Sequence, residues 1–229
     1  MNTRGLLDQL LKSGQDLLQQ KTGKSSGKSG NGNLGSLLTG AGGGALAAGA
    51  LGLLLGNKSA RKLGGKALTY GGLAALGVLA YKAYGNWQAQ QAAAPQGEPQ
   101  TLDRLPAPQA EQHSQAILKA LVAAAKADGH VDARERQLIE EELAKLTQDA
   151  DLRRWLDAEL NKPLDPADVA RAATTPEMAA EMYLASVLMV DEEHFMERAY
   201  LEELARQLRL DPGLKVELER QVRQELVSQ

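Results

Sequence analysis

Apolar and polar positions follow two different patterns in the two halves of the chain. Between residues 111 and 229, apolar residues recur every three to four positions among charged ones, which is typical of amphipathic helices. Runs that alternate β-branched or aromatic residues with polar ones are absent, so the pattern predicts an all-α fold. Several helix starts are indicated by a capping residue followed by proline, namely Asp165-Pro166, Thr175-Pro176 and Asp211-Pro212.

The first 55 residues combine an amphipathic stretch, a polar tether and an uncharged apolar run. Residues 1–20 place leucines at helical spacing, and residues 21–33 consist largely of Gly, Ser and Lys, which predicts a disordered tether. Residues 34–55 carry no charge and contain 8 Leu, 7 Gly and 5 Ala. As a helix they would span roughly 33 Å, which is enough to cross a bilayer. The sequence therefore predicts a Gly-rich membrane anchor over residues 34–87.

A second uncharged run, residues 67–81, decides how often this anchor crosses. It is too short to span alone, but it could cross if extended to Trp87, with Lys82 reaching the interface. One span would put the basic stretch after residue 55 and the C-terminal domain in the cytoplasm, and this is the arrangement that we expect. A two-helix hairpin would put the domain outside, and it remains open. Small residues four apart, such as Gly40 and Gly44, also favour a homo-oligomer.

Composition separates the anchor from an acidic domain. Residues 88–110 are rich in Gln, Ala and Pro, which predicts a polar linker and a domain boundary. Residues 1–108 carry 11 basic and 4 acidic side chains, a net charge of +7, whereas residues 109–229 carry 15 and 25, a net charge of −10. A basic anchor region suits an anionic lipid surface, and the acidic half would be repelled by nucleic acid. The chain has no cysteine, so disulfides and thiol catalysis are excluded.

Two stretches of the C-terminal half resemble each other. They read LVAAAKADGHVDARERQLIEEELAKL from Leu121 and YLASVLMVDEEHFMERAYLEELARQL from Tyr183. Each combines an apolar helix, an acidic turn and an amphipathic helix. The repeat predicts two related helical hairpins, packed about a pseudo-twofold axis, within residues 111–229.

The ADGHVDARE turn resembles the acidic signature of TerB-like domains, the helical module of tellurite-resistance proteins. A Gly-rich apolar anchor, the NKSARK stretch and the DEEHFMERAYLEELA segment together resemble YebE-type inner-membrane proteins of Gram-negative bacteria. This likeness covers nearly the full chain. It implies an all-α domain whose acidic residues bind a divalent cation.

The resemblance implies six candidate metal ligands. Carboxylates in two turns would suit Ca²⁺ or Mg²⁺, and an added imidazole would shift the preference toward Mn²⁺ or Zn²⁺. Capping explains part of the first turn equally well, because Asp132 and Glu135 are placed as an N-cap and the third helical residue. The two interpretations remain open. The candidates are Asp128, Asp132 and Glu135 in the first turn, and Asp191, His194 and Glu197 in the second.

No catalytic arrangement is found, so we expect a non-enzymatic protein. His113 and His130 lie near a helix start and in a turn, where both are expected to be solvated, and four methionines between residues 178 and 196 are expected to fill the core. The favoured function is a membrane-anchored scaffold that recruits a basic protein partner, under possible cation control. The alternative is a metal or tellurite resistance factor that binds a divalent cation at the acidic turns.

Overall fold

The computed structural model describes residues 2–8, 73–91, 97–127, 147–190 and 194–227. Within these ranges every regular element is a helix, which confirms the all-α expectation. A short helix covers residues 3–8. The other helices of the described residues are α4 (Leu73–Gln90), α5 (Ala107–Ala125), α7 (Ala150–Asn161), α8 (Pro166–Ala170), α9 (Pro176–Met189), α10 (Phe195–Gln207) and α11 (Pro212–Val227).

Among these helices, none combines the length and apolarity that crossing a bilayer requires. The uncharged run predicted to cross, residues 34–55, lies outside the described residues, as does the tether before it. The transmembrane helix therefore stays a prediction.

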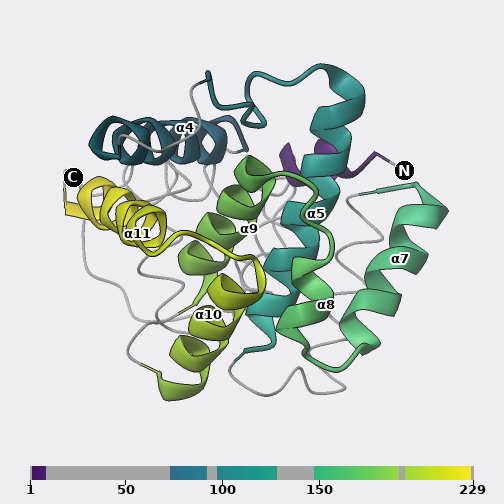
Figure 1. Ribbon diagram of the computed structural model, residues 1–229. Helices are drawn as coiled ribbons and strands as arrows, with labels where there is room; N and C mark the ends of the chain where they lie inside the picture. Colours follow the sequence, from purple (N-terminus) through teal and green to yellow (C-terminus); the bar gives the residue numbers. More distant parts are fainter. Residues whose placement is uncertain (1, 9–72, 92–96, 128–146, 191–193, 228–229) are drawn as a thin grey trace, which may run out of the picture.

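Helix α9 is the centre of the domain. Figure 1 shows it between α5 and α7 on one side and α4 and α11 on the other. It contacts α4, α5, α10 and α11, and ten consecutive residues from Met178 to Val187 are buried, as expected for a helix covered on all sides. Its interface with α5 contains many small side chains, because both helices bury several alanines.

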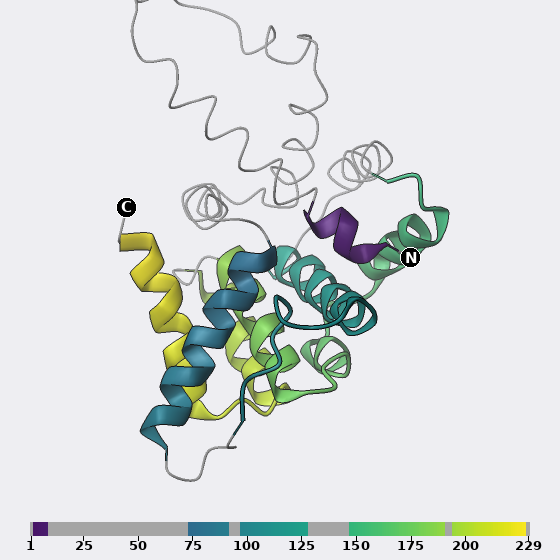
Figure 2. The same ribbon diagram turned by 90° about the horizontal axis from the view of Figure 1, so that it is seen from above.

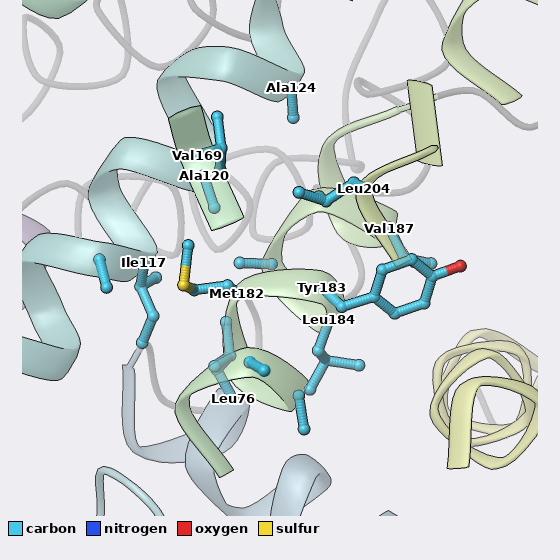
Figure 3. Packing of buried hydrophobic residues seen from close by; sticks show 14 of the residues in the cluster. Leu76, Ile117, Ala120, Ala124, Val169, Met182, Tyr183, Leu184, Val187 and Leu204 are labelled. Atoms are coloured by element: carbon cyan, nitrogen blue, oxygen red, sulfur yellow. The ribbon is translucent and has the colours of Figure 1, made fainter. Parts of the chain in front are cut away.

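The core is apolar and surrounds α9. Figure 3 shows Met182 turned toward Ile117 of α5, whereas the Tyr183 ring points away from them. The Tyr183 hydroxyl donates a hydrogen bond to Glu219 of α11 over 2.7 Å. Met178 and Met182 are fully buried, which confirms the expected core role for these two, but Met196 is 60% exposed.

The predicted helix starts are confirmed. Asp165 accepts a hydrogen bond from the Ala167 amide over 2.9 Å at the start of α8. Thr175 accepts one from the Met178 amide over 3.1 Å at the start of α9. Asp211 accepts from the amides of the first turn of α11. Each side chain satisfies an amide that has no partner within its helix.

Helix α4 packs against α9 and α11, so the helical assembly includes residues that the sequence assigned to the anchor. Figure 2 shows α4 and α11 side by side. Leu76, Ala80 and Tyr84 are buried in the common core. The Asn86 amide also donates a hydrogen bond to Glu217 of α11 over 2.8 Å.

The expected linker also contacts the core. Leu102 is buried, and the Arg104 guanidinium lies 3.8 Å from the centre of the Tyr81 ring on α4. Close approach at this point requires a glycine: a Cβ added to Gly77 would lie 2.7 Å from Oδ1 of Asp103 and 3.0 Å from its backbone nitrogen. Residues 101–104 are therefore folded against the domain.

The N-terminal helix packs on the same domain. Glu111 of α5 accepts hydrogen bonds from the backbone amides of Thr3 and Arg4, over 2.5 and 3.1 Å. Asp149, the N-cap of α7, accepts one from the Asn2 amide over 3.1 Å. Leu7 is 1% exposed and belongs to the core. Residues 2–8 are thus held between α5 and α7.

The second expected hairpin is formed by α9 and α10, which contact each other. Helix α5 contains the first helix of the other repeat, and its interface with α9 brings the two repeats together. The rest of that repeat, residues 128–146, lies outside the described residues. The pseudo-twofold relation between complete hairpins stays a prediction.

Candidate binding groove

A groove of about 890 Å³ opens where the end of α4, the α8–α9 connection and the α10–α11 connection meet. Its walls combine apolar side chains with three arginines, Arg171, Arg206 and Arg209. The N-termini of α9 and α11 also open on it, through Thr175 and Asp211. Pockets that bind ligands have this size and this mixture of apolar walls with a few polar groups.

Arg209 has a left-handed backbone conformation, with φ of 54°. It follows the last turn of α10, where the Leu210 amide bonds to the Ala205 carbonyl and the Arg209 amide to the Arg206 carbonyl. This is the Schellman arrangement, in which glycine is the favoured residue. An arginine there costs about 1 kcal/mol because its Cβ crowds the backbone. The sequence keeps a charged side chain at a position where glycine would fit better.

The other two arginines have acidic partners. Arg171 pairs with Asp168 over 2.6 Å, and Arg206 donates to Glu203 over 2.8 Å. The Arg206 hydrogen bond is the main reason that the pKa of Glu203 falls to about 2. Among the described residues, Arg209 has no such partner. Its guanidinium is therefore the groove's available positive charge.

The acidic residue of the groove, Asp211, is committed to other contacts. Its Oδ1 accepts hydrogen bonds from the Trp87 indole over 2.9 Å and from the Gly213 amide over 2.8 Å. These donors, with the Trp87 indole first, lower the pKa of Asp211. Trp87 packs edge-on against Tyr84 at a centroid distance of 5.2 Å. Asp211 thus joins α4 to the start of α11 at one end of the groove.

A second polar cluster is buried between α5, α9 and the linker. Nδ1 of His113 lies 2.5 Å from Oε2 of Glu181, and the Leu102 amide donates to Oε1 over 2.5 Å. His113 is 4% exposed and Glu181 is 0% exposed. The expectation that His113 is solvated was wrong, because its ring turns inward to a carboxylate that lies 68 residues later. The cluster belongs to the core and is separate from the groove.

Of the six predicted metal ligands, only two belong to the described residues. His194 precedes α10 and is exposed, and Glu197 lies in the first turn of α10 and is 2% exposed. Asp128, Asp132, Glu135 and Asp191 lie outside the described ranges. Within those ranges, no group of three or more histidine or carboxylate side chains could hold a metal ion. The cation site stays a prediction, as does the choice between ligands and caps in the first turn.

Sequence analysis did not single out the residues of the groove. Arg171, Arg206 and Arg209 come from segments that show no shared motif. A weak signal was available, because arginine occurs at a helix end where Gly or Asn would be expected, after the QL of ARQLRLDP.

Comparison with known proteins identifies relatives of unknown function. A family model described as "Protein of unknown function (DUF533)" matches residues 40–222, and this is a TerB-like family, as the resemblance implied. A protein from Yersinia enterocolitica described as "Uncharacterized protein in ampR 5'region" is 34% identical over 118 residues. That alignment covers 52% of this chain and 85% of the relative. No solved structure matches.

Proposed function

The chain belongs to the DUF533 family, and from that premise we propose that it is a membrane-associated, non-enzymatic interaction module of the bacterial envelope, similar to YebE-type inner-membrane proteins. The proposal joins two parts of the molecule. The uncharged residues 34–55 would hold the protein at the bilayer, and the helical domain would recruit a partner through its groove.

The membrane part rests on the uncharged run of residues 34–55, and the packing of both its flanks on one domain sets the proposed topology. Residues 2–8 bind α5 and α7, and α4 binds α9 and α11. A single crossing by residues 34–55 would place these two docked segments on opposite sides of the bilayer. The 17 residues from 56 to 72 carry Lys58, Arg61, Lys62 and Lys66, so they are poorly suited to a second crossing.

The proposed segment therefore enters and leaves the membrane on the face where the domain lies. Glycines between residues 40 and 44 favour a turn there, because glycine weakens a helix. The lysines on both flanks would then meet the same leaflet, whose anionic headgroups attract them. Under the positive-inside rule this face is cytoplasmic.

The interaction part is supported by the groove. Its walls combine apolar side chains with a few polar and charged groups, and its volume of about 890 Å³ lies in the range of ligand-binding pockets.

Cysteine labelling tests the proposed topology, because the natural chain has no cysteine to react. Ser25→Cys and Ser59→Cys report on the two flanks, and Gln148→Cys, at an exposed position, reports on the domain. A membrane-impermeant maleimide should label all three in inverted inner-membrane vesicles and none in intact spheroplasts. Labelling of Ser25→Cys from the face opposite to Gln148→Cys would contradict the shared face. Recovery of the full chain in the soluble fraction would contradict membrane association.

A further inference from the structure

We propose that the groove binds a protein segment in which a carboxylate is flanked by apolar side chains, and that Arg209 receives this carboxylate. The inference deepens the proposed interaction role and rests on it. It is independent of the membrane, because every residue that carries it belongs to the helical domain.

The apolar side chains of the groove set the first requirement for its occupant. Leu208, Leu210 and Leu214 line the groove together with Ala170 and Ala173. Leu208 and Leu214 are largely buried in the core, whereas Leu210 keeps part of its surface exposed. A volume of about 890 Å³ exceeds what one small side chain fills, so the occupant has several apolar groups.

The charged side chains of the groove set the second requirement for its occupant. The groove contains three arginines and one aspartate, whereas residues 109–229 as a whole have a net charge of −10. The Asp211 carboxylate already accepts hydrogen bonds from Trp87, Gln91 and the first turn of α11. A basic segment would meet guanidinium groups, whereas a carboxylate would gain charge-assisted hydrogen bonds. The net charge of the domain led us to expect a basic partner, but the local charge of the groove is opposite.

The backbone of Arg209 is the independent observation. Its φ of 54° is the conformation in which glycine costs least, so folding gains nothing from an arginine there. Residues held in such conformations cluster at functional sites. Arg209 lines the groove, and its side chain has no acidic partner among the described residues. This combination assigns Arg209 to the occupant rather than to the fold.

Selection of short random peptides displayed on phage against the full-length chain, purified in detergent, tests this inference. We expect enrichment of sequences that place Asp or Glu next to Leu, Ile or Phe. Fluorescence anisotropy of a labelled consensus peptide should then show about a tenfold loss of affinity for both Arg209→Ala and Arg209→Gly, equivalent to about 1.4 kcal/mol. Arg209→Lys should retain most of the affinity, and the affinity should fall with added salt.

Arg153→Ala is the matched control, since Arg153 is exposed on α7 and lies outside the groove. Arg209→Gly keeps the test valid, because this variant should fold at least as well as the natural chain. Enrichment of basic peptides, or affinity unchanged in both Arg209 variants, would overturn the inference. Arg209-dependent binding to vesicles of phosphatidylglycerol and phosphatidylethanolamine, without peptide binding, would also overturn it by assigning the groove to lipid. Failure of the topology experiment would leave these outcomes unaffected.

Discussion

His113 Nδ1 lies 2.5 Å from Oε2 of Glu181, and both side chains are buried at the interface of α5 and α9. The other carboxylate oxygen accepts the Leu102 amide, so Glu181 joins two helices to the folded linker. A buried carboxylate is costly unless its hydrogen bonds are complete. The cluster therefore makes the position of the linker depend on one side chain of the central helix.

Removing the Glu181 carboxylate should expose this dependence. We expect Glu181→Ala to lower the free energy of unfolding by about 3 kcal/mol, because the His113 ring and the Leu102 amide lose their partner. Glu181→Gln should lose less, since its amide offers an oxygen and an NH₂ group in similar positions. Urea unfolding at neutral pH measures both, with the exposed Glu202→Ala on α10 as the control. Equal losses for Gln and Ala would show that the hydrogen bonds contribute little.

The same carboxyl group predicts a pH dependence. Burial raises the pKa of Glu181 above its ordinary value of 4.5, although hydrogen bonds from His113 and Leu102 act in the opposite direction. The folded protein therefore binds this proton more tightly than the unfolded chain. This contribution to stability is fully present below pH 4.5 and is lost as the pH rises through the folded pKa. As the pH rises over that range, the free energy of unfolding of the natural chain should therefore fall relative to that of Glu181→Gln.

Two glycines of α4 should respond oppositely to alanine. A Cβ at Gly85 would meet no atom within 4 Å, so Gly85→Ala should raise the free energy of unfolding by about 0.5–1 kcal/mol through helix propensity. At Gly77 the added Cβ would lie 3.0 Å from the backbone nitrogen of Asp103, so Gly77→Ala should lower stability by about 1 kcal/mol. Thermal unfolding of the pair measures both effects. A gain for Gly77→Ala would show that the linker moves away without cost.

Features set by neighbouring residues were predictable from the sequence, whereas contacts between residues far apart in the chain were not. The starts of α8, α9 and α11 were predictable because a cap and the following proline are adjacent in the chain. The docking of α4 was not, because an apolar run has the same pattern whether it faces lipid or a protein core. His113 was misjudged for a related reason. Its partner Glu181 lies on another helix, and no spacing rule connects them.

The groove was still less predictable. It forms where three segments meet, and each of its arginines looks like a solvated surface residue when the chain is read alone. In the folded domain, Arg209 differs from the other two in its positive φ and in having no acidic partner among the described residues. Its positive φ is a property of the folded end of α10. The residue type did not indicate it, because arginine has no preference for the left-handed region.

Relief of that backbone strain should be measurable as stability. Arg209→Gly should raise the free energy of unfolding by about 1 kcal/mol, because glycine adopts a positive φ without crowding. Glu202 is exposed and lies in the middle of α10, so Glu202→Gly should lower the free energy of unfolding by about 1 kcal/mol and serves as the matched control. Urea unfolding of both variants measures the contrast. A loss of stability in Arg209→Gly would show that the side chain supports the fold after all.

The α4–α11 contact should weaken in acid. Glu217 accepts hydrogen bonds from Arg220 over 2.7 Å and from Asn86 over 2.8 Å, and chiefly Arg220 lowers its pKa to about 2. Because the folded pKa lies below the ordinary value of 4.5, this carboxylate stabilises the fold above pH 4.5. That contribution is lost as the pH falls toward 2.

Glu217→Gln isolates this effect. At neutral pH it should lower the free energy of unfolding by about 1 kcal/mol, because half of the charged pair is lost and Arg220 remains partly in water. Toward pH 2 the difference from the natural chain should shrink. Unfolding followed by circular dichroism at both pH values measures it. A difference that stays constant with pH would rule out a contribution from the carboxylate charge.

The alanines between α5 and α9 affect how mutational scans of this domain should be read. Ala116, Ala120 and Ala124 are buried on α5, and Ala180 and Ala185 on α9. Alanine scanning leaves these five positions unchanged, so it would miss their contribution to the interface of α5 and α9. Substitution by leucine would add volume where close-packed helices have none to spare, and each change should cost about 1–3 kcal/mol. The tolerance of this domain to substitution at its centre is therefore limited by side-chain size, and a scan toward larger residues would map it.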